Sequence, residues 1–366
     1  MKALLLAGGL GTRLHPLTYN LPKPMVPVAN RPWLEHLLGL LKRHNISEVI
    51  CSLCYRPEII MNYFGDGSAF GIRMQYVVEK TPLGTGGAIR FAEHLLDDTF
   101  LVFNADIVTD LDLTSVVNFH KQNKARVTIA LTWVDDPTAY GAVEMDRNGR
   151  ILKFIEKPSK DQITTNFVNA GVYVFEPDIL ERIPRGRPVS LEREVYPSLL
   201  DEGVPVYGYG SRFYWMDLGT HKRYLALHAD IFQGKLNLEI QGKRNNAGTA
   251  TGIATANDNP GGGAISLGDQ RDQVIIGREA HVHPTSRIHG PVIIGDRCVV
   301  NAGAVVGPMT VLGPGVVVGE GTHVRNSVIW AGTRIGSRAH LDRVIVGENY
   351  TVEDGRELRS MAIAES

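Results

Sequence analysis

The chain has little of the features that most readily place a protein in a class. It has three cysteines in 366 residues, Cys51, Cys54 and Cys298, which are too few and too scattered for a disulfide framework. Its net charge of −1 excludes a bulk electrostatic attraction to nucleic acid or to an anionic membrane. It also lacks any run near the ~18 apolar residues that a membrane-spanning helix needs. We therefore expect a protein of the reducing cytoplasm that has neither nucleic acid nor a membrane as a partner.

Two of the cysteines have the C-x-x-C spacing of some redox and zinc sites. Cys51 and Cys54 stand at the end of a strand-like run, where residues three apart face opposite ways. Buried thiols that pack as small apolar groups are therefore the better interpretation.

Glycines and cations gather directly after the first apolar run of the chain. Residues 3–7 have the length of a strand that is buried on both faces. Three glycines within positions 8–11 let the backbone approach a ligand closely and turn N–H groups toward it, which suits bound phosphate. Arg13 and Lys23 add two cations, so the segment predicts a nucleotide-phosphate site at the carboxyl end of an open α/β sheet. The predicted site consists of Leu6, Ala7, Gly8, Gly9, Gly11, Thr12, Arg13 and Lys23.

This segment differs in spacing from two better-known phosphate-binding loops. It lacks G-x-x-x-x-G-K-[ST], and G-x-G-x-x-G would need glycine where the chain has Leu14. A tight surface turn would explain the glycines but not the cations beside them. The pattern G-G-x-G-T-R-x-x-P-x(6)-K-P, from Gly8 to Pro24, resembles the nucleotide-binding signature of the sugar-1-phosphate nucleotidyltransferases. The resemblance extends over about residues 1–235 and is strongest to bacterial mannose-1-phosphate guanylyltransferase-like proteins.

A second glycine-rich turn, residues 81–87, lies between a predicted strand at 72–78 and a predicted helix at 88–96. A flexible connection would explain one or two glycines, but three of the four residues at 84–87 are glycine. In the family, a similar P-L-G-T-[AG]-G segment faces the base and the ribose of the nucleotide. The resemblance therefore implies that the nucleoside is framed by Gly84, Thr85 and Gly86.

Two aspartates follow apolar runs, as ligand residues of α/β proteins often do. Asp106 comes just past a predicted strand at 100–103, and the carboxyl ends of such strands border the ligand crevice. Mg²⁺ favours one or two carboxylates together with phosphate oxygens, although an aspartate here can also merely cap the next turn. The resemblance implies that Asp106 and Asp217 hold the ion and that Asn104 contacts the nucleotide.

A predicted hairpin, with arms at about 140–143 and 151–155, interrupts the alternation of strands and helices. Its second arm ends in E-K-P, and a further strand at 168–175 carries N-A-G near its start. Similar Y-G, E-K-P and N-A-G segments form the sugar-phosphate pocket of the family. The resemblance implies that Lys157 pairs with the phosphate of the sugar. The implied sugar-binding residues are Gly141, Glu156, Lys157, Asn169 and Gly171.

The implied reaction joins a sugar-1-phosphate to a nucleoside triphosphate and releases pyrophosphate. A phosphate oxygen of the sugar attacks the α-phosphorus in line, and because this nucleophile is already anionic no general base is required. The sequence accordingly has no persuasive Ser-His-Asp or Cys-His constellation. Catalysis then consists of positioning and electrostatic stabilisation. The implied catalytic residues are Arg13, Lys23, Lys157, Asp106 and Asp217, with Mg²⁺ as the cofactor.

The last third of the chain changes character. Residues 236–272 have no periodicity and indicate a flexible linker rich in glycine and asparagine. Aliphatic residues then recur every six positions, which is typical of a parallel β-helix. The resemblance is to left-handed hexapeptide helices, over residues 273–350, with a C-terminal tail at 351–366. Such solenoids often serve for assembly, so we expect a homo-oligomer formed through the β-helix. The repeating aliphatics are Ile276, Val282, Ile288, Ile294, Val300, Val306, Leu312, Val318 and Val324 and, after one slip in register, Ile329, Ile335 and Leu341.

These observations together predict an α/β protein with a Rossmann-like, doubly wound mixed sheet in residues 1–235, followed by the linker and the left-handed parallel β-helix. Overall likeness favours GTP and mannose-1-phosphate as substrates, although the glycine loops alone do not identify the base. Glucose-1-phosphate with a uridine or thymidine triphosphate is an alternative. A non-catalytic subunit that senses nucleotide-sugars is another, and an acyltransfer activity added on the β-helix is a third.

Overall fold

The computed structural model describes residues 1–241, 243–245, 249–250, 264–266 and 273–365. The chain forms two compact units, each built from several segments. The first unit consists of Met1–Leu10, Pro22–Pro24 and Leu37–Asp217. The second consists of Gly11–Leu21, Met25–His36 and Leu218–Ser366. The signature segment that was predicted to bind phosphate is therefore divided between the two units.

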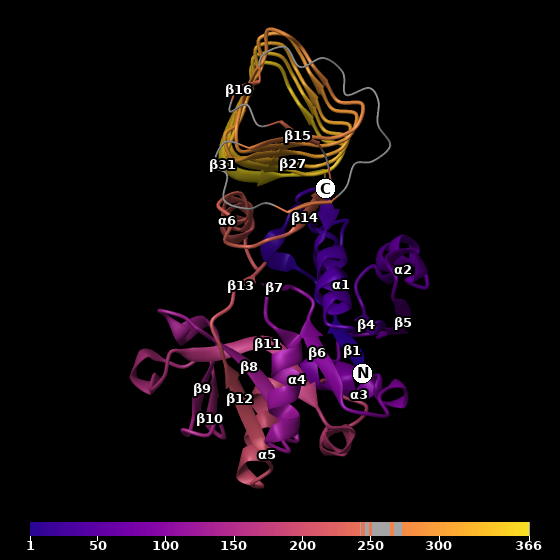
Figure 1. Cartoon of the computed structure of the whole chain (residues 1–366), viewed down its shortest axis with the longest axis vertical. Helices are drawn as coiled ribbons and strands as arrows, with labels where there is room; N and C mark the ends of the chain where they lie inside the picture. The colour runs from indigo at the N-terminus through magenta and orange to yellow at the C-terminus, as the bar shows by residue number, and fades with distance from the viewer. Residues whose placement is uncertain (242, 246–248, 251–263, 267–272, 366) are drawn as a thin grey trace. The chain divides into compact units, whose positions relative to one another are not determined.

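The first unit is built on a mixed sheet, which confirms the predicted Rossmann-like class. Its strands are β1 (Lys2–Leu6), β4 (Glu48–Leu53), β5 (Arg73–Val78), β6 (Phe100–Asn104), β8 (Val127–Trp133), β9 (Gly141–Met145), β10 (Ile151–Glu156), β11 (Phe167–Phe175) and β12 (Val206–Gly210). Seven of them follow the order β10-β9-β11-β6-β1-β4-β5, and β8 joins β12 to β11 (Figure 1). β1, β4, β5 and β6 run parallel, whereas β11 is antiparallel to β6 and adjoins the predicted hairpin of β9 and β10.

Helices connect the strands of this sheet. They are α1 (Trp33–Arg43), α2 (Pro57–Phe64), α3 (Gly84–Phe91), α4 (Leu113–Gln122) and α5 (Tyr196–Asp201), the last preceded by a π-helical turn at Leu191–Val195. Pro57 occupies the first position of α2, where its missing N–H costs nothing. The helix expected at 88–96 starts four residues earlier, at Gly84. Among the described residues, no helix combines the length and the apolar composition that crossing a membrane would take.

The strand pairing places the ends of several strands at one edge of the sheet. Leu6, the last residue of β1, lies opposite Ser52 in β4 and opposite Asn104 in β6. Just past β6, strand β7 (Ile107–Thr109) pairs antiparallel with β13 (Trp215–Asp217), and Asp217 lies opposite Ile107. This pairing brings two segments that are far apart in the sequence to the same edge.

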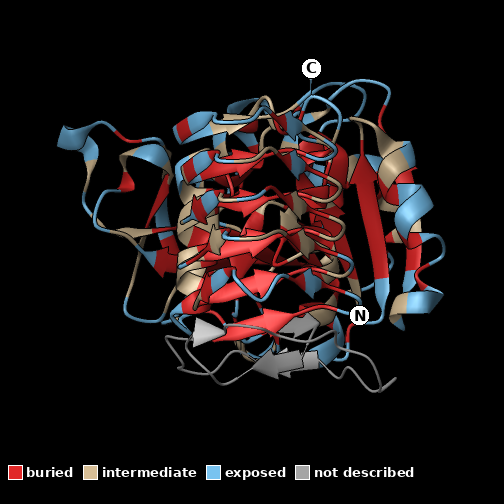
Figure 2. Ribbon diagram, turned by 90° about the horizontal axis from the view of Figure 1, so that it is seen from above, coloured by how far each residue is buried: buried red, intermediate tan, exposed pale blue. Residues whose placement is uncertain are grey.

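The second unit contains the predicted parallel β-helix, whose coils stack as successive buried layers (Figure 2). Ile276 pairs with Ile294 and Ile294 with Leu312, each three six-residue repeats apart. Leu312 pairs with Ile329, and this spacing along the chain is one residue shorter than in the two preceding pairs. The shorter spacing is the predicted slip in register. All twelve predicted aliphatics are buried, so the repeat correctly identified the core. The strands are β18 (Val274–Ile276), β19 (His281–Val282), β20 (Arg287–His289), β21 (Val292–Ile294), β22 (Val299–Val300), β23 (Val305–Val306), β24 (Thr310–Leu312), β25 (Val317–Val318), β26 (His323–Arg325), β27 (Val328–Ile329), β28 (Arg334–Ile335), β29 (His340–Val346), β30 (Thr351–Val352) and β31 (Glu357–Ile363).

The β-helix continues past the boundary expected at residue 350. β30 pairs with β28 and β31 pairs with β29, so most of the segment expected as a tail at 351–366 belongs to the last coil. Val352 and Leu358 are buried and continue the aliphatic core. The linker expected at 236–272 lies mostly outside the described residues. Within it the structure describes residues 236–238 and the short strands β14 (Glu239–Gln241), β15 (Lys243–Asn245), β16 (Thr249–Ala250) and β17 (Ala264–Ser266).

Helix α6 (His221–Phe232) packs between the β-helix and the N-terminal segments of the second unit. The hydroxyl of Tyr224 donates to the carbonyl oxygen of Pro27, in the short hairpin of β2 (Pro27–Val28) and β3 (Arg31–Pro32). Trp330, in the β-helix, donates from Nε1 to the same hydroxyl at 3.1 Å. Residues that follow the signature segment are thereby attached to α6 and to the β-helix.

Candidate functional site

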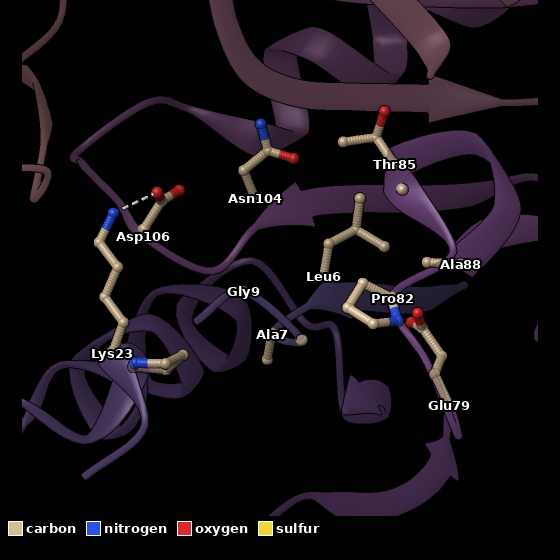
Figure 3. Close-up of a pocket in the computed structure, with 13 residues that line it drawn as sticks. Leu6, Ala7, Gly9, Lys23, Glu79, Pro82, Thr85, Ala88, Asn104 and Asp106 are labelled. Carbon is tan, nitrogen blue, oxygen red and sulfur yellow. Dashed lines mark hydrogen bonds and ion pairs between the residues drawn. The ribbon is translucent and has the colours of Figure 1, made fainter. Parts of the chain in front are cut away.

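A cavity of about 290 Å³ lies at the edge of the sheet where β1 and β6 end (Figure 3). Its walls come from the end of β1 and the glycines after it, the end of β6, the start of α3 and the 3-10 turn η2 (Lys23–Met25). Residues from both predicted glycine-rich segments therefore line the cavity. Its lining residues are Leu6, Ala7, Gly8, Gly9, Lys23, Pro24, Glu79, Pro82, Gly84, Thr85, Ala88, Asn104 and Asp106.

A buried lysine stands between two carboxylates at this cavity. Lys23 Nζ donates to Oδ2 of Asp106 at 2.5 Å, and Oδ1 of Asp217 lies 3.5 Å from the same nitrogen. The side chain of Lys23 is only 10% exposed, and burying an ammonium is costly unless it is paired. The ammonium is thus paired with two carboxylates.

The fold explains how the two aspartates meet. Asp106 comes two residues after the end of β6, beside the last residue of β1. Asp217 is the last residue of β13, which pairs with β7 directly after Asp106. The two residues that were expected to share an ion are thus brought to one place by a short antiparallel pair.

The donor set fits Mg²⁺ that is bound together with a substrate. Asp106 Oδ2 and Asp217 Oδ1 lie 2.5 and 3.5 Å from the same nitrogen, so the two carboxylates face a common position. In the part of the chain that the structure describes, no group of three or more His, Cys, Asp or Glu side chains is arranged to hold a metal. Mg²⁺ is usually held by one or two carboxylates and completes its octahedron with water and phosphate oxygens, so two carboxylates are sufficient.

The first glycines of the signature differ in what they contact. A Cβ on Gly8 would lie 3.2 Å from Cβ of Cys54, so this glycine permits close packing of the loop. A Cβ on Gly9 would meet nothing within 4 Å, and Gly9 is exposed. The open backbone at Gly9 is therefore the part of the loop that a ligand can approach.

Three of the residues that were predicted to bind phosphate belong to the second unit. Gly11 has φ +65° and begins the 3-10 turn η1 (Thr12–Leu14), and the Thr18 hydroxyl donates to its carbonyl oxygen at 2.9 Å. Arg13 is exposed. The predicted phosphate contacts of Gly11, Thr12 and Arg13 stay predictions.

The second glycine-rich turn has a structural reason that the sequence did not reveal. Gly84 has φ +72°, and a Cβ there would lie 2.6 Å from the carbonyl oxygen of Val189. Gly86 N donates to that oxygen at 2.9 Å, and Val189 N donates to the carbonyl oxygen of Leu83 at 2.8 Å. The glycines therefore let the segment before the π-helical turn pack against α3, while Gly84 and Thr85 still line the cavity.

The sequence analysis missed Glu79, a buried carboxylate in the wall of the cavity. Its Oε1 accepts from the Ser52 hydroxyl at 2.7 Å, and its Oε2 accepts from Leu83 N at 2.8 Å. The available signal was its place just after the strand at 72–78 and before the glycine-rich turn. A single glutamate is ordinarily a surface residue, so the signal was weak.

A second glutamate that was missed fixes the start of α3. Glu192 Oε2 accepts from the hydroxyls of Thr85 and Ser190, each at 2.8 Å. The Thr85 hydroxyl oxygen in turn accepts from Leu191 N at 2.9 Å. Thr85 is therefore oriented by a network that leaves its backbone in the wall of the cavity.

The predicted sugar segments lie beside β13, the strand that carries Asp217. Trp215 Nε1 donates to the carbonyl oxygen of Ala170 at 2.9 Å, and its ring lies 5.2 Å from the ring of Tyr140. Lys157 N donates to the carbonyl oxygen of Tyr140 at 2.8 Å. The Y-G, E-K-P and N-A-G segments are thus linked to one another around Trp215.

Individual sugar-site residues have defined surroundings. Asn169 donates to the Tyr173 hydroxyl at 2.9 Å and accepts from Gly171 N at 2.9 Å. Gly171 has φ +74°, and a Cβ there would meet Asn104 Nδ2 at 2.9 Å. A Cβ on Gly141 would meet the ring of Phe154 at 2.5 Å. The two glycines are therefore required by packing as well as by any ligand.

The charged pair of the E-K-P segment is only partly withdrawn from solvent. Burial raises the pKa of Glu156, and the charge of Glu192 raises it further. Lys157 is exposed and has φ +52°, a conformation that directs the chain sharply after β10. A protonatable acid and an exposed ammonium thus stand at the end of β10.

Comparison with known proteins matches both units. Residues 2–234 match the family described as nucleotidyl transferase, and residues 288–365 match the GMPPB C-terminal domain. A mannose-1-phosphate guanylyltransferase of Mycobacterium tuberculosis is 42% identical over 83% of this chain and 82% of its own length. A UTP–glucose-1-phosphate uridylyltransferase of Synechocystis is 32% identical over 100% of this chain and 92% of its own length.

Part of the chain also resembles a solved structure. HddC from Yersinia pseudotuberculosis, complexed with GMP-PN, is 27% identical and superposes with a TM-score of 0.54. The match covers 62% of this chain and 97% of HddC. The likeness in fold therefore extends over almost the whole of that protein.

Proposed function

Because the chain is an enzyme of the nucleotidyl transferase family, we propose that it transfers a guanylyl group from GTP to mannose-1-phosphate, which yields GDP-mannose and pyrophosphate. The observation that carries this proposal is the Lys23 ammonium held between Asp106 and Asp217 at the rim of the cavity. The proposal assigns this cation and these two carboxylates to the phosphates of the triphosphate and to its metal ion.

The contacts of Lys23 with Asp106 and Asp217 suggest how the negative charge of the phosphates is neutralised on binding. Without substrate, the ammonium partly neutralises the carboxylates of Asp106 and Asp217. Mg²⁺ bound by these carboxylates supplies positive charge to the phosphates. Lys23 is assigned to phosphate oxygens of the triphosphate, and Arg13 is assigned to the departing pyrophosphate. The open backbone at Gly9 adds N–H donors to the same end of the ligand.

Lys157 is assigned to the phosphate of the sugar, where it orients the attacking oxygen. Glu156, Asn169 and the backbone near Gly141 and Gly171 are assigned to the sugar hydroxyls. The side chain of Asn169 is held at both ends by hydrogen bonds, which fixes its orientation before the ligand arrives. No residue needs to remove a proton, because the sugar phosphate is already anionic.

The buried carboxylate of Glu79 supports guanine as the base. The Watson–Crick edge of guanine has two neighbouring donors, N1–H and the 2-amino group, which a carboxylate accepts. Uracil and thymine instead flank a single N–H with carbonyl oxygens, which a carboxylate repels. The specific observation in favour of the second candidate, a glucose-1-phosphate uridylyltransferase, is the full-length likeness to the Synechocystis relative.

Pyrophosphate release tests both candidates. The full-length chain is mixed with Mg²⁺, one of five triphosphates (GTP, ATP, UTP, CTP or dTTP) and mannose-, glucose- or N-acetylglucosamine-1-phosphate. We expect the highest kcat/KM for GTP with mannose-1-phosphate. A preference for UTP with glucose-1-phosphate would favour the second candidate. Absence of pyrophosphate with every pair would leave the nucleotide-sugar-sensing role.

Assembly and location stay proposals of the same kind. The β-helix is proposed to join copies of the chain into a homo-oligomer in the cytoplasm. Sedimentation of the full chain beside a chain ending before Val274 tests the first part. An unchanged oligomeric state would assign assembly to another surface.

A further inference from the structure

A second cavity, of about 410 Å³, adjoins α3 in the first unit. Pockets for small molecules typically have volumes of about 300–1,000 Å³, so this cavity is large enough for one. The proposed nucleotide cavity is lined by the first turn of α3, whereas this one is lined by its end. Its lining residues are Val78, Glu79, Lys80, Thr81, Leu83, Gly87, Arg90, Phe91, Glu93, Pro184, Arg185, Gly186 and Arg187.

Positive charge dominates this cavity. Arg90 and Arg185 share one carboxylate, that of Glu93, at 2.9 and 2.8 Å. Arg187 pairs with Glu194 outside the cavity, at 2.8 Å. Lys80 also lines the cavity and, among the described residues, has no recorded ion pair. Four cations therefore surround a space that contains few carboxylates, and an anion would be attracted there.

Arg90 is the most deeply placed of these cations. Its side chain is 12% exposed, and its Nε has no hydrogen-bond partner among the described residues. Glu93 therefore satisfies only part of a guanidinium that is largely removed from water. Such a group is stabilised when a further anion approaches it, because a buried charge is costly unless it is well paired.

Apolar side chains line the same cavity. Val78 and Phe91 both line the cavity, and their side chains are 41% and 44% exposed. They give the cavity an exposed apolar wall. Leu83 and Pro184 add further apolar lining. An exposed phenyl ring beside guanidinium groups suits a ligand that combines a flat ring with a negative group.

We propose that this cavity, which shares only Glu79 with the lining of the nucleotide cavity, binds a small molecule that carries a phosphate group and an aromatic ring, such as a nucleoside monophosphate. Its phosphate pairs with Arg185 and Arg187, and its ring packs on Val78 and Phe91. Arg90 contributes charge from below the surface.

The backbone around Val189 connects this cavity to the proposed nucleotide site. The Val189 carbonyl accepts from Gly86 N, and a Cβ on Gly87 would lie 3.2 Å from the carbonyl oxygen of Arg187. The segment that carries the two exposed arginines is thus packed directly on the glycine-rich turn. A ligand that draws Arg185 and Arg187 toward itself therefore changes the affinity of the first cavity for its nucleotide.

Calorimetric titration tests the binding claim without any enzyme assay. AMP is titrated into the full chain in the presence of saturating GTP, so that the nucleotide cavity is occupied, with no sugar phosphate present. We expect a Kd below about 1 mM, equivalent to roughly 4 kcal/mol of binding free energy. The double substitution of Arg185→Ala with Arg187→Ala should weaken binding at least tenfold. Adenosine and inorganic phosphate should each bind more weakly than AMP, since each offers only one of the two contacts.

Arg182→Ala is the matched control, because Arg182 is a nearby surface arginine, paired with Glu202, that does not line the cavity. It should leave AMP binding unchanged. Equal binding of AMP by the double variant and the unaltered chain overturns the proposal, as does absence of binding at about 10 mM AMP. Inorganic phosphate that binds as tightly as AMP overturns the role of the ring.

A kinetic measurement tests the connection between the cavities. AMP should change the KM for GTP in the unaltered chain and in Arg182→Ala but not in the double variant. Binding without any change in this KM overturns the coupling through α3. Because the calorimetry needs no turnover, failure of the proposed guanylyl transfer and failure of this second site are distinguishable.

Discussion

The Glu79→Gln substitution tests how the chain selects its base. Each carboxylate oxygen of Glu79 accepts one hydrogen bond in the structure, from the Ser52 hydroxyl and from Leu83 N. A carboxylate oxygen has room for two, so each oxygen keeps one acceptor position for the N1–H and 2-amino donors of guanine. Glutamine keeps the shape of the side chain but has one acceptor oxygen and no charge.

The magnitude follows from the strength of a charge-assisted hydrogen bond. Such a bond contributes about 1.5–3 kcal/mol, and about 1.4 kcal/mol corresponds to a factor of ten. Glu79→Gln should therefore lower kcat/KM for GTP by roughly 10- to 100-fold. ITP lacks the 2-amino group, so the unaltered chain should prefer GTP to ITP, and Glu79→Gln should remove most of that preference.

The assay is pyrophosphate release with GTP and ITP, accompanied by a thermal melt of each variant. Glu58→Gln is the control for the same chemical change at an exposed position in α2. Ser52→Ala removes a neighbour of the carboxylate but keeps its charge, so it should keep the preference for GTP. If the ratio of GTP to ITP stays the same in a folded Glu79→Gln variant, Glu79 does not contact the base. An equal loss in Ser52→Ala would assign the effect to packing and would refute the reasoning as well.

Four further changes have defined outcomes. Asp106→Asn should lower kcat by roughly 100-fold or more, because it replaces one of the two carboxylates beside the buried ammonium, a proposed ion ligand, with a neutral amide. Near-normal turnover in the folded variant would remove Asp106 from the ion site. Lys157→Ala should raise the KM for the sugar phosphate and leave that for GTP unchanged, and steady-state kinetics in which only the GTP value rises would reassign the residue. Gly84→Ala should lower the unfolding free energy by about 1–3 kcal/mol in chemical denaturation, since its φ is +72° and the new Cβ would lie 2.6 Å from a carbonyl oxygen. Gly203 has the same φ with nothing within 4 Å of an added Cβ, so Gly203→Ala is the matched control, and an equal loss in both would assign the effect to φ alone. Burial raises the pKa of Glu156, so the contribution of this residue to stability is present below its unfolded-state pKa and is lost as pH rises through its native-state pKa. Glu156→Gln should therefore raise Tm more at pH 7 than at pH 4. A larger gain in Tm at pH 4 would contradict the direction of the pKa shift.

Periodic features of the fold could be predicted from the sequence. The β-helix has one aliphatic position in each six residues, and the residues at that position are buried in its core. The prediction ended too early because the spacing from Leu341 to Val346 is again one residue short, although the strands of the last coil still pair. A repeat is therefore visible only as far as its spacing is regular.

The site was predictable where local rules apply. Asp106 follows a buried strand, and the crevice rule for open sheets places it at the ligand edge. Asp217 required the family resemblance, because its position depends on the pairing of β13 with β7. Glu79 was missed because its burial depends on hydrogen bonds from Ser52 and Leu83. No local sequence pattern predicts these two partners.

Glycine shows a different limit of sequence reasoning. A glycine indicates that something approaches the backbone closely, but it does not indicate what approaches. The glycines at 84–87 were assigned to the nucleoside alone, whereas the backbone of Val189 lies against them. Substitution of these glycines therefore reports on packing and ligand binding together, which is why a control at an open position such as Gly203 is needed.

The division of the signature segment between the two units determines what lies on either side of Lys23 in the chain. Lys23 is joined through Pro22 and Pro24 to two segments that belong to the second unit. In the earlier segment the carbonyl oxygen of Leu14 lies 3.0 Å from Nε2 of His221 in α6, and in the later one Asn30 donates to the β-helix at 2.9 Å. Lys23 is covalently connected to both of these segments, so a shift of either segment would also move the lysine.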